Sequence, residues 1–126
     1  IVWDVKSWEP IRTLRGHQGS VTAAVYSPDG RRLYSAGVDK LVRVWDRDTG
    51  REIGTFPGHP GGVRALAVSR DGKRLATAGL DKVVKVWDAA SGNVLFTLVG
   101  HGSELSAVAF SPDGSRLATA SWDKTV

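Results

Sequence analysis

The stretch DKLVRVWD at residues 39–46 decides the fold, because it recurs 42 residues later as DKVVKVWD at residues 81–88. A third copy is divided between the two ends of the chain. Residues 123–126 (DKTV) match its first half, and residues 1–4 (IVWD) match its second half. Since 126 residues are three times 42, the chain holds three whole repeats. We therefore expect residues 123–126 of one copy to continue, in space, into residues 1–5 of another.

Each repeat also carries a Gly-His pair at a fixed distance before the Trp-Asp pair. The three pairs are Gly16-His17, Gly58-His59 and Gly100-His101. Gly-His and Trp-Asp in this order, at this period, resemble the WD40 repeat family. The resemblance covers residues 1–126 and implies three blades that form part of one β-propeller.

Within one repeat the apolar and turn residues predict four short strands, at residues 21–26, 32–36, 41–45 and 52–56. No segment has the period and the capping signals of a helix. We expect an all-β fold, in which four-stranded antiparallel sheets are arranged radially as propeller blades. The first strand of each repeat is apolar on both faces, so we expect it to be innermost and buried on both faces. Pro10 cannot donate to a ladder, which predicts an outer edge for the strand that contains it.

The first two strands of each repeat are joined by a tight turn that contains Asp-Gly. Ser27-Pro28-Asp29-Gly30 suits a type I turn closed by a left-handed glycine, and residues 69–72 and 111–114 repeat it. Trp8 stands where the outer turns of the other repeats have Gly50 and Gly92. We expect its indole to lie over the neighbouring strand.

The composition is that of a soluble globular protein, with 41% hydrophobic and 24% charged residues. No apolar run is long enough to span a membrane, no secretory signal is visible, and there are no cysteines. The compartment is not encoded, although a natural protein of this kind would be cytoplasmic. The divided repeat and the missing initiating Met lead us to expect an excised or engineered segment.

His17, Ser35 and Asp39 are the residue types of a hydrolytic triad, but the trio recurs in every repeat, whereas an active site is normally built once. The WD40 resemblance implies instead a structural hydrogen-bond network from Trp through Ser or Thr and His to Asp. We expect the hydroxyl in it to accept a hydrogen bond from the imidazole. The chain is therefore expected to be no enzyme, and it carries no motif for a cofactor or a metal. The expected network residues are His17, Ser35, Asp39 and Trp45; His59, Thr77, Asp81 and Trp87; and His101, Thr119, Asp123 and Trp3.

The same resemblance implies where a protein or peptide partner docks. These positions follow the Gly-His pair or precede the repeated Asp, and they are Gln18, Ser20, Val38, Pro60, Gly62, Leu80, Gly102, Glu104 and Trp122. Trp122 is the large aromatic residue among them, a type enriched at binding hot spots. It is expected to be either ordinary packing, which we favour slightly, or an anchor.

Two further expectations concern partners. The net charge of +4 and the bases after each Asp-Gly turn, such as Arg31, Arg32 and Arg74, allow an alternative function as a phosphate- or nucleic-acid-binding module. Nucleic acid is the weaker reading, because Asp29, Asp71 and their equivalent dilute the field and no aromatic residue interleaves with the bases. The leading hypothesis is a non-enzymatic scaffold of the protein-interaction class. We expect it to close its ring by homo-oligomerisation, with two chains giving six blades or three giving nine.

Overall fold

The computed structural model describes all 126 residues, which form strands and turns without a helix. The strands near the N-terminus are short, and the later ones span five or six residues. Their bounds are β1 Val2–Trp3, β2 Pro10–Arg12, β3 Val21–Tyr26, β4 Arg32–Gly37, β5 Leu41–Asp46, β6 Glu52–Pro57, β7 Val63–Val68, β8 Arg74–Gly79, β9 Val83–Asp88, β10 Val94–Val99, β11 Leu105–Phe110 and β12 Leu117–Ser121.

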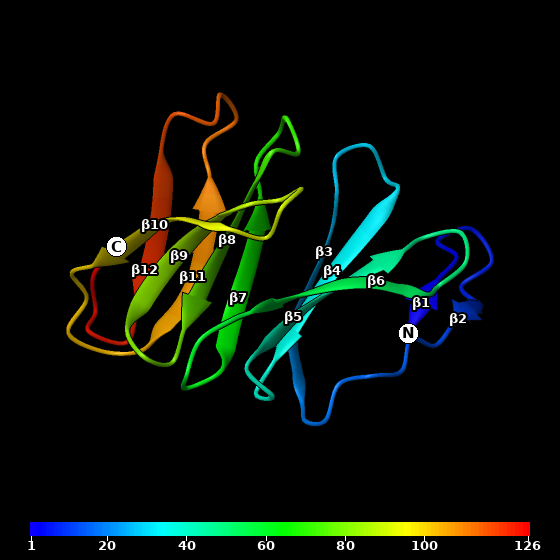
Figure 1. Cartoon of the computed structure of the whole chain (residues 1–126), viewed down its shortest axis with the longest axis horizontal. Coiled ribbons are helices and arrows are strands. Elements are labelled where there is room, and N and C mark those ends of the chain that lie inside the picture. Colours follow the sequence, from blue (N-terminus) through cyan, green and yellow to red (C-terminus); the bar gives the residue numbers. More distant parts are fainter.

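The strands make two whole sheets and two half sheets. β3 to β6 form one four-stranded antiparallel sheet in chain order, and β7 to β10 form the second. β1 pairs with β2, and β11 pairs with β12, as separate two-stranded sheets. Figure 1 shows the sheets side by side along the chain, with the N-terminal half sheet at one end and the C-terminal half sheet at the other. The expected all-β class and its four-stranded antiparallel sheets are confirmed.

The turns between the first two strands of each repeat are held in the same way. The three glycines Gly30, Gly72 and Gly114 have φ between 67° and 71°, a left-handed conformation that glycine adopts without strain. In the first of these turns the Ser27 hydroxyl donates to Asp29 at 2.6 Å, and it also accepts from the Arg32 amide at 2.9 Å. Asp-Gly in this turn therefore has the backbone geometry that its sequence predicts.

Neighbouring sheets pack through two apolar cores. Between the two whole sheets, Tyr34 and Val42 lie against Val63, Leu75 and their neighbours, and all of these are almost fully buried. The second core joins the β7–β10 sheet to the half sheet of β11 and β12 through Ala76, Ala78, Val84, Leu105 and Val108. The small side chains allow the sheets to approach closely. This packing fixes the order of the sheets along the chain.

The expected double burial of the innermost strands is not what the structure shows. β4 and β8 are buried along nearly their whole length, whereas β3, β7 and β11 are mostly half-buried or exposed. Each innermost strand ends its sheet, so one of its edges has no strand beside it. Apolar residues on both faces of a strand therefore indicate that sheets pack on both faces. They do not predict that the strand is buried when one of its edges is open to solvent.

Trp8 also departs from expectation. Its φ is 60°, close to the values of 68° and 74° at Gly50 and Gly92, and its amide donates to the Asp4 carbonyl at 2.8 Å. The left-handed turn is thus kept without glycine. The Trp8 side chain is 73% exposed, so it does not lie over the neighbouring strand. A side chain on a left-handed turn residue points away from the hairpin, which accounts for the difference.

Candidate functional site

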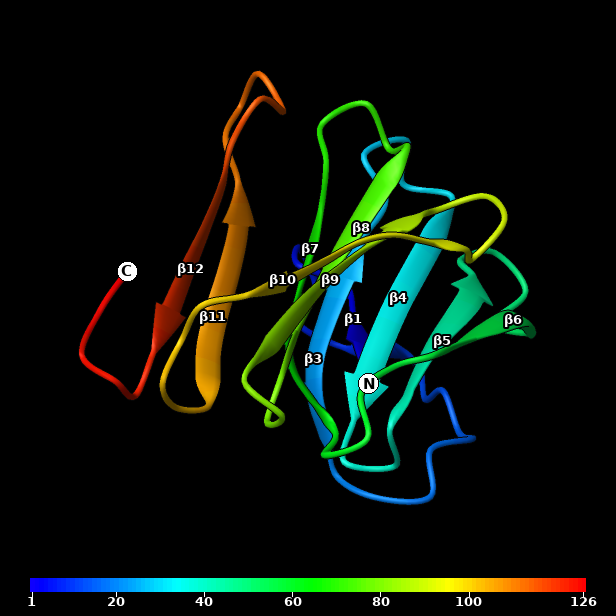
Figure 2. The same ribbon diagram turned by 60° about the vertical axis from the view of Figure 1, so that its left-hand side comes forward.

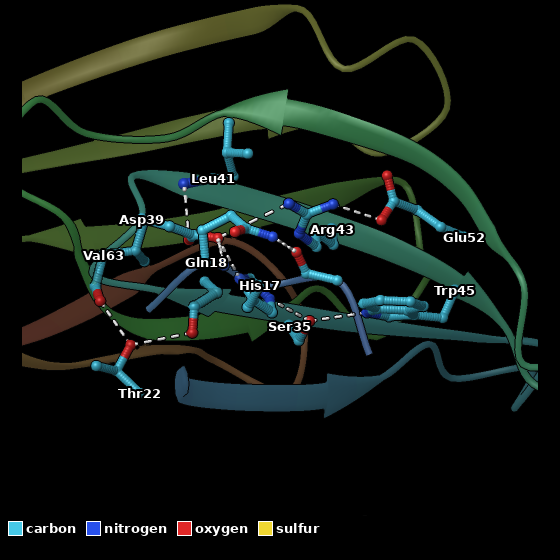
Figure 3. Close-up of polar contacts among 12 residues, drawn as sticks. His17, Gln18, Thr22, Ser35, Asp39, Leu41, Arg43, Trp45, Glu52 and Val63 are labelled. Atoms are coloured by element: carbon cyan, nitrogen blue, oxygen red, sulfur yellow. Dashed lines mark hydrogen bonds and ion pairs between the residues drawn. The ribbon is translucent and has the colours of Figure 1, made fainter. Parts of the chain in front are cut away.

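The first polar network joins the second and third strands of its sheet to the loop that precedes β3 (Figure 3). His17 Nδ1 lies 2.8 Å from a carboxylate oxygen of Asp39, and His17 Nε2 lies 2.7 Å from Ser35 Oγ. Trp45 Nε1 donates to the same hydroxyl at 2.8 Å. The four residues expected in this network are therefore in contact.

The second network repeats this geometry with a threonine. His59 lies 2.9 Å from Asp81 and 2.7 Å from Thr77 Oγ1, and Trp87 Nε1 donates to that hydroxyl at 2.9 Å. His59, Thr77 and Trp87 are at most 1% exposed. Lys85 adds a cation at 5.5 Å from the centre of the Trp87 ring, and its ammonium donates to the Gly58 carbonyl at 2.9 Å.

The third network is incomplete. His101 lies 2.8 Å from both Asp123 and Thr119, as in the other repeats. Trp3, which the sequence assigns to this network, is 52% exposed and lies with the N-terminal half sheet, far from β12 (Figure 1). The Thr125 hydroxyl lies close to the same groups instead, donating to Asp123 at 2.6 Å. The structure thus brings three of the four expected residues together.

Proton positions in the second network follow from the pKa of His59. Burial lowers this pKa below the ordinary value and outweighs the opposing effect of Asp81, so the ring is neutral. With Nδ1–H donating to the carboxylate, Nε2 carries a lone pair and must accept from the Thr77 hydroxyl. That hydroxyl in turn accepts from the Trp87 indole. With this tautomer the Thr77 hydroxyl donates to the imidazole, which is the reverse of the direction expected from the sequence, because neutral histidine has a single N–H.

The carboxylates of Asp39 and Asp123 are held in their ionised form. Burial by itself would raise the pKa of Asp39, but hydrogen bonds from His17 and from the Gln18 amide outweigh it and lower the pKa below the usual value. The pKa of Asp123 is also lowered, chiefly by the hydroxyl of Thr125 and then by His101. Both aspartates therefore remain acceptors for their histidines at neutral pH.

This arrangement has the atom order of a hydrolytic triad without its accessibility. Ser35 is 6% exposed and Thr77 is 0% exposed, and each hydroxyl already accepts an indole N–H. A nucleophile must be able to reach a substrate carbonyl and give its proton to the histidine as it attacks. A hydroxyl enclosed by tryptophan, histidine and backbone is suited to satisfying buried polar groups instead.

The networks also hold the loops that were expected to bind a partner. Besides His17, Asp39 accepts a hydrogen bond from the Gln18 amide at 3.1 Å, and Asp123 accepts one from the Gly102 amide at 2.9 Å. The residue after the second Gly-His pair is Pro60, which has no N–H to donate. The histidine and the loop that follows it are thus fixed by one carboxylate in two repeats of three.

A second set of backbone hydrogen bonds ties the residue before each repeated Asp to the same loop. The Val38 amide donates to the Ser20 carbonyl at 3.0 Å, and the Trp122 amide donates to the Glu104 carbonyl at 3.0 Å. The middle repeat has the equivalent bond at 3.1 Å. We call the nine positions the loop face: Gln18, Ser20, Val38, Pro60, Gly62, Leu80, Gly102, Glu104 and Trp122.

Most of the loop face is open to solvent. Trp122 is 67% exposed and Val38 is 44% exposed. Leu80 is half-buried and Gly62 is buried. A Cβ added at Gly62 would lie 3.2 Å from the Val38 backbone, so the loop passes close to Val38 at this residue. Trp122 is therefore not packed in this chain, contrary to the reading favoured from the sequence, and Gly62 shapes the loop rather than offering a contact surface.

The three hairpin tips that contain the Asp-Gly turns lie at the same end of the sheets (Figure 1), and arginines line the hollows between them. A hollow of about 410 Å³ between the second and third tips is lined by Arg70 and Arg74, but also by Asp71 and Asp113. The hollow between the first and second tips likewise has two arginines and two aspartates. Hydrogen bonds from Ser111 and Ser115 lower the pKa of Asp113 to about 2. Each hollow therefore contains as many negative as positive side chains, which gives the phosphate-binding alternative no support.

Three features near the networks were missed from the sequence. Arg43 pairs with Glu52 at 2.5 Å on the adjacent strand, and Lys85, its equivalent one repeat later, covers Trp87. The shared positive charge at these two equivalent positions was the available signal. Thr125 is the third addition, since its equivalents are the apolar Leu41 and Val83.

No group of three or more His, Cys, Asp or Glu side chains is arranged to hold a metal ion. The structure also contains no helix that is long and apolar enough to cross a membrane.

The model of the family described as WD domain, G-beta repeat matches residues 8–46, 50–88 and 92–126. The chain belongs to the WD40 repeat family. This family consists generally of non-enzymatic scaffolds that are typical of protein-interaction modules. The starts of its matches are 42 residues apart, in agreement with the repeat period. Each match is offset by one strand from the sheets, because β6 and β10 fall in the match that follows their own sheet's first three strands.

Individual WD40 proteins resemble parts of the chain. A p21-activated protein kinase-interacting protein 1-like protein from Danio rerio is 43% identical over 42 residues, which are 33% of this chain and 11% of that protein. Its Gallus gallus counterpart is 36% identical over 42 residues, again 33% and 11% of the two chains. The solved structure of U3-55K and that of the RRP9 WD40 repeats each superpose with a TM-score of 0.86 at 36% identity, covering 89% of this chain and 36% of theirs. The matched segment spans only about a ninth of the length of the Danio rerio and Gallus gallus relatives.

Proposed function

We propose that this WD40 chain is a non-enzymatic interaction scaffold that binds a protein or peptide segment on its loop face. We further propose that it completes its propeller by assembling with copies of itself. The relatives from Danio rerio and Gallus gallus are named as p21-activated protein kinase-interacting protein 1-like proteins, which is consistent with a protein partner for this chain.

The exposure of Trp122 on a rigid backbone carries the partner proposal. Its indole is 67% exposed, while its amide is fixed to Glu104 and the following Asp123 is fixed to His101. Tryptophan offers a large contact area at a low cost in conformational entropy, because its rigid ring has only two side-chain torsions to fix and its backbone is already held. Val38, on the same face, adds an apolar contact at 44% exposure. These features favour a segment with an apolar side chain that packs on the indole.

A displayed library of random peptides tests the loop face. We expect peptides selected on the parent chain to lose binding to Trp122→Ala and to retain binding to Trp8→Ala, because Trp8 is an exposed tryptophan outside the loop face. The Val38→Ser variant should weaken binding less. Peptides that bind the Trp122→Ala variant as well as the parent would contradict this assignment.

Self-assembly is supported by apolar positions at the two ends of the sheet stack. Val63 is fully buried between the whole sheets, whereas its equivalent Val21 is 53% exposed. At the other end, Leu98, Thr119 and Val126 line a hollow of about 330 Å³ beside the incomplete third network. A second copy would place Trp3 at this network, and its β1 and β2 would extend β11 and β12 to a four-stranded sheet.

Head-to-tail contacts of this kind must close by rotation. We favour the ring of two chains over the ring of three, because six blades fall within the usual four to eight and nine do not. Light scattering tests the proposal: a monodisperse dimer supports six blades and a trimer supports nine. On dilution, the ring formed by the Trp3→Ala variant should dissociate at a higher protein concentration than the ring formed by the Trp8→Ala control. A stable folded monomer of the parent at micromolar concentration would refute ring closure.

A further inference from the structure

The two contacts between sheets inside the chain show how one sheet fits the next. In the first contact, Tyr34 of β4 on the earlier sheet lies in the same core as Val68 of β7 on the later sheet. In the second contact, Ala76 of β8 lies in the same core as Phe110 of β11. Tyr34 and Ala76 are equivalent residues of successive repeats, and so are Val68 and Phe110. Since β4 packs on β7 and β8 packs on β11, the two pairs hold equivalent places.

These two places are matched in size. Where the earlier sheet has the aromatic residue Tyr34, the later sheet has valine. Where the earlier sheet has Ala76, the later sheet has phenylalanine. Tyr34 and Ala76 are at most 1% exposed, so both contacts are closed at this point. Each contact thus takes one aromatic ring here, because two rings would overpack it and two small side chains would leave a cavity.

The free faces at the two ends of the stack continue the same pattern. Ala118 on β12 is equivalent to Tyr34 and Ala76, and Tyr26 on β3 is equivalent to the valine and phenylalanine of the later sheets. Ala118 is exposed, and Tyr26 is 43% exposed. Figure 2 shows β11 and β12 at the end of the stack, with no further sheet on their outer face. Brought together, the two free faces would again place one aromatic ring opposite a small side chain.

The free face of the first sheet is open only over its inner strands. Val2 of β1 and Ile11 of β2 line a small hollow together with Trp45 of β5, so the N-terminal half sheet already covers the outer part. Val21 and Tyr26 of β3 remain 53% and 43% exposed. β1 and β2 correspond to the third and fourth strands of a repeat, and the strands that would complete their sheet are the first and second. β11 and β12 of a second copy are such strands.

A hydroxyl on β11 is placed for the same contact. Thr22 on β3 donates to a carbonyl of its own sheet at 3.1 Å and to the Val63 carbonyl of the next sheet at 2.6 Å (Figure 3). Its equivalent Ser106 makes the first of these hydrogen bonds at 3.2 Å, but no sheet follows it. The carbonyl equivalent to that of Val63 in a following sheet is the Val21 carbonyl of a second copy.

We propose that Tyr26 of one copy packs against Ala118 of another, and that this match in size fits one chain to the next. The Ser106 hydroxyl then donates to the Val21 carbonyl across the same contact. The side chains that meet here are uncharged. This inference rests on the proposed self-assembly and names the residues that decide its fit.

The Ala118→Tyr variant tests the fit. It would place two aromatic rings opposite each other, and overpacking should raise the protein concentration at which the assembly half-dissociates by at least about tenfold. Light scattering over a dilution series measures this concentration. The matched control is Ala90→Tyr, which changes an exposed alanine in the turn between β9 and β10 and should assemble as the parent does.

A second change should rescue the first. The Tyr26→Val/Ala118→Tyr double variant gives the contact the same arrangement as Tyr34 and Val68 in the first core, so it should assemble at close to the parent's concentration. Tyr26→Val alone leaves a gap and should weaken assembly. In a ring of two chains, an equal mixture of the two single variants should also assemble, because each contact then holds one tyrosine.

The outcomes separate the fit from self-assembly itself. A parent that assembles, together with an Ala118→Tyr variant that assembles equally well, would overturn the fit and leave ring closure standing. A double variant that dissociates as readily as Ala118→Tyr alone would overturn the fit as well. A parent that stays a folded monomer would refute ring closure and the fit together, and would leave the free face to a sheet of another protein.

Discussion

The second and third networks have the same residue types at the same spacing, but they differ in how well they are enclosed. The His59 side chain is 0% exposed, whereas that of His101 is 15% exposed. Trp87 closes the second network from its own sheet, while no tryptophan reaches the third. Thr125 donates to Asp123 instead. The hydrogen bonds of a repeat thus follow from its local sequence, but their burial is supplied by the adjoining strand and the next sheet.

Removing Trp87 should have the largest effect on stability, because it takes away the enclosure that distinguishes the second network from the third. The Trp87→Ala variant deletes a fully buried indole that donates to Thr77 and stacks on Phe56, and it should cost about 3–5 kcal/mol in the free energy of unfolding. Chemical denaturation measures this, with the exposed Trp8→Ala as control. A loss below about 1 kcal/mol would show that the tryptophan does not seal the network.

Removing the aspartate from each network tests the same difference in enclosure between the second and third networks. Asp81→Ala leaves the buried His59 without its acceptor and should cost about 1–3 kcal/mol. Asp123→Ala should cost less, because His101 is more open to water and Thr125 remains nearby. Thermal unfolding of the two variants gives the comparison. Equal losses, or a thermal midpoint for Asp81→Ala that matches the parent, would contradict the role of burial.

Acid should act on the second network through His59. Burial lowers the pKa of His59 in the folded chain below its ordinary value of 6.5, so the unfolded chain binds a proton more readily. The stability contributed by neutral His59 is full above about pH 6.5, and it is lost as the pH falls toward the lowered folded value.

Denaturation between about pH 7 and pH 5 measures this slope. We expect His59→Gln to flatten it and the matched His101→Gln to leave most of it. A slope that stays unchanged in His59→Gln would mean that another group carries the acid response.

The smallest effect is expected at Trp122. Its indole is 67% exposed, so Trp122→Phe should change stability by no more than about 0.5 kcal/mol. The same change should reduce the fluorescence that a soluble quencher reaches, because Trp122 contributes to it together with the exposed Trp3 and Trp8, whereas Trp45 and Trp87 are buried. An undiminished quencher-accessible signal would end the candidacy of Trp122 as an exposed anchor.

The sequence by itself determined the repeat period, the all-β class, the order of four strands in a repeat and the tight Asp-Gly turns. These features depend on residues close together in the chain, where alternation and turn chemistry leave few options. The partners of His17 and His59 were predicted through the WD40 resemblance, and they meet because the strands that carry them are adjacent in the same sheet.

Only the tertiary structure decided which of these groups are enclosed. It places Trp3 away from His101, turns Trp8 and Trp122 toward solvent, and fixes the direction of the hydroxyl proton through the burial of His59. It also shows that β10 is an uncovered edge while Phe56 is covered by the next sheet. Burial depends on contacts between sheets, which equivalent repeats do not share when their neighbours differ, and so identical local motifs acquire different environments.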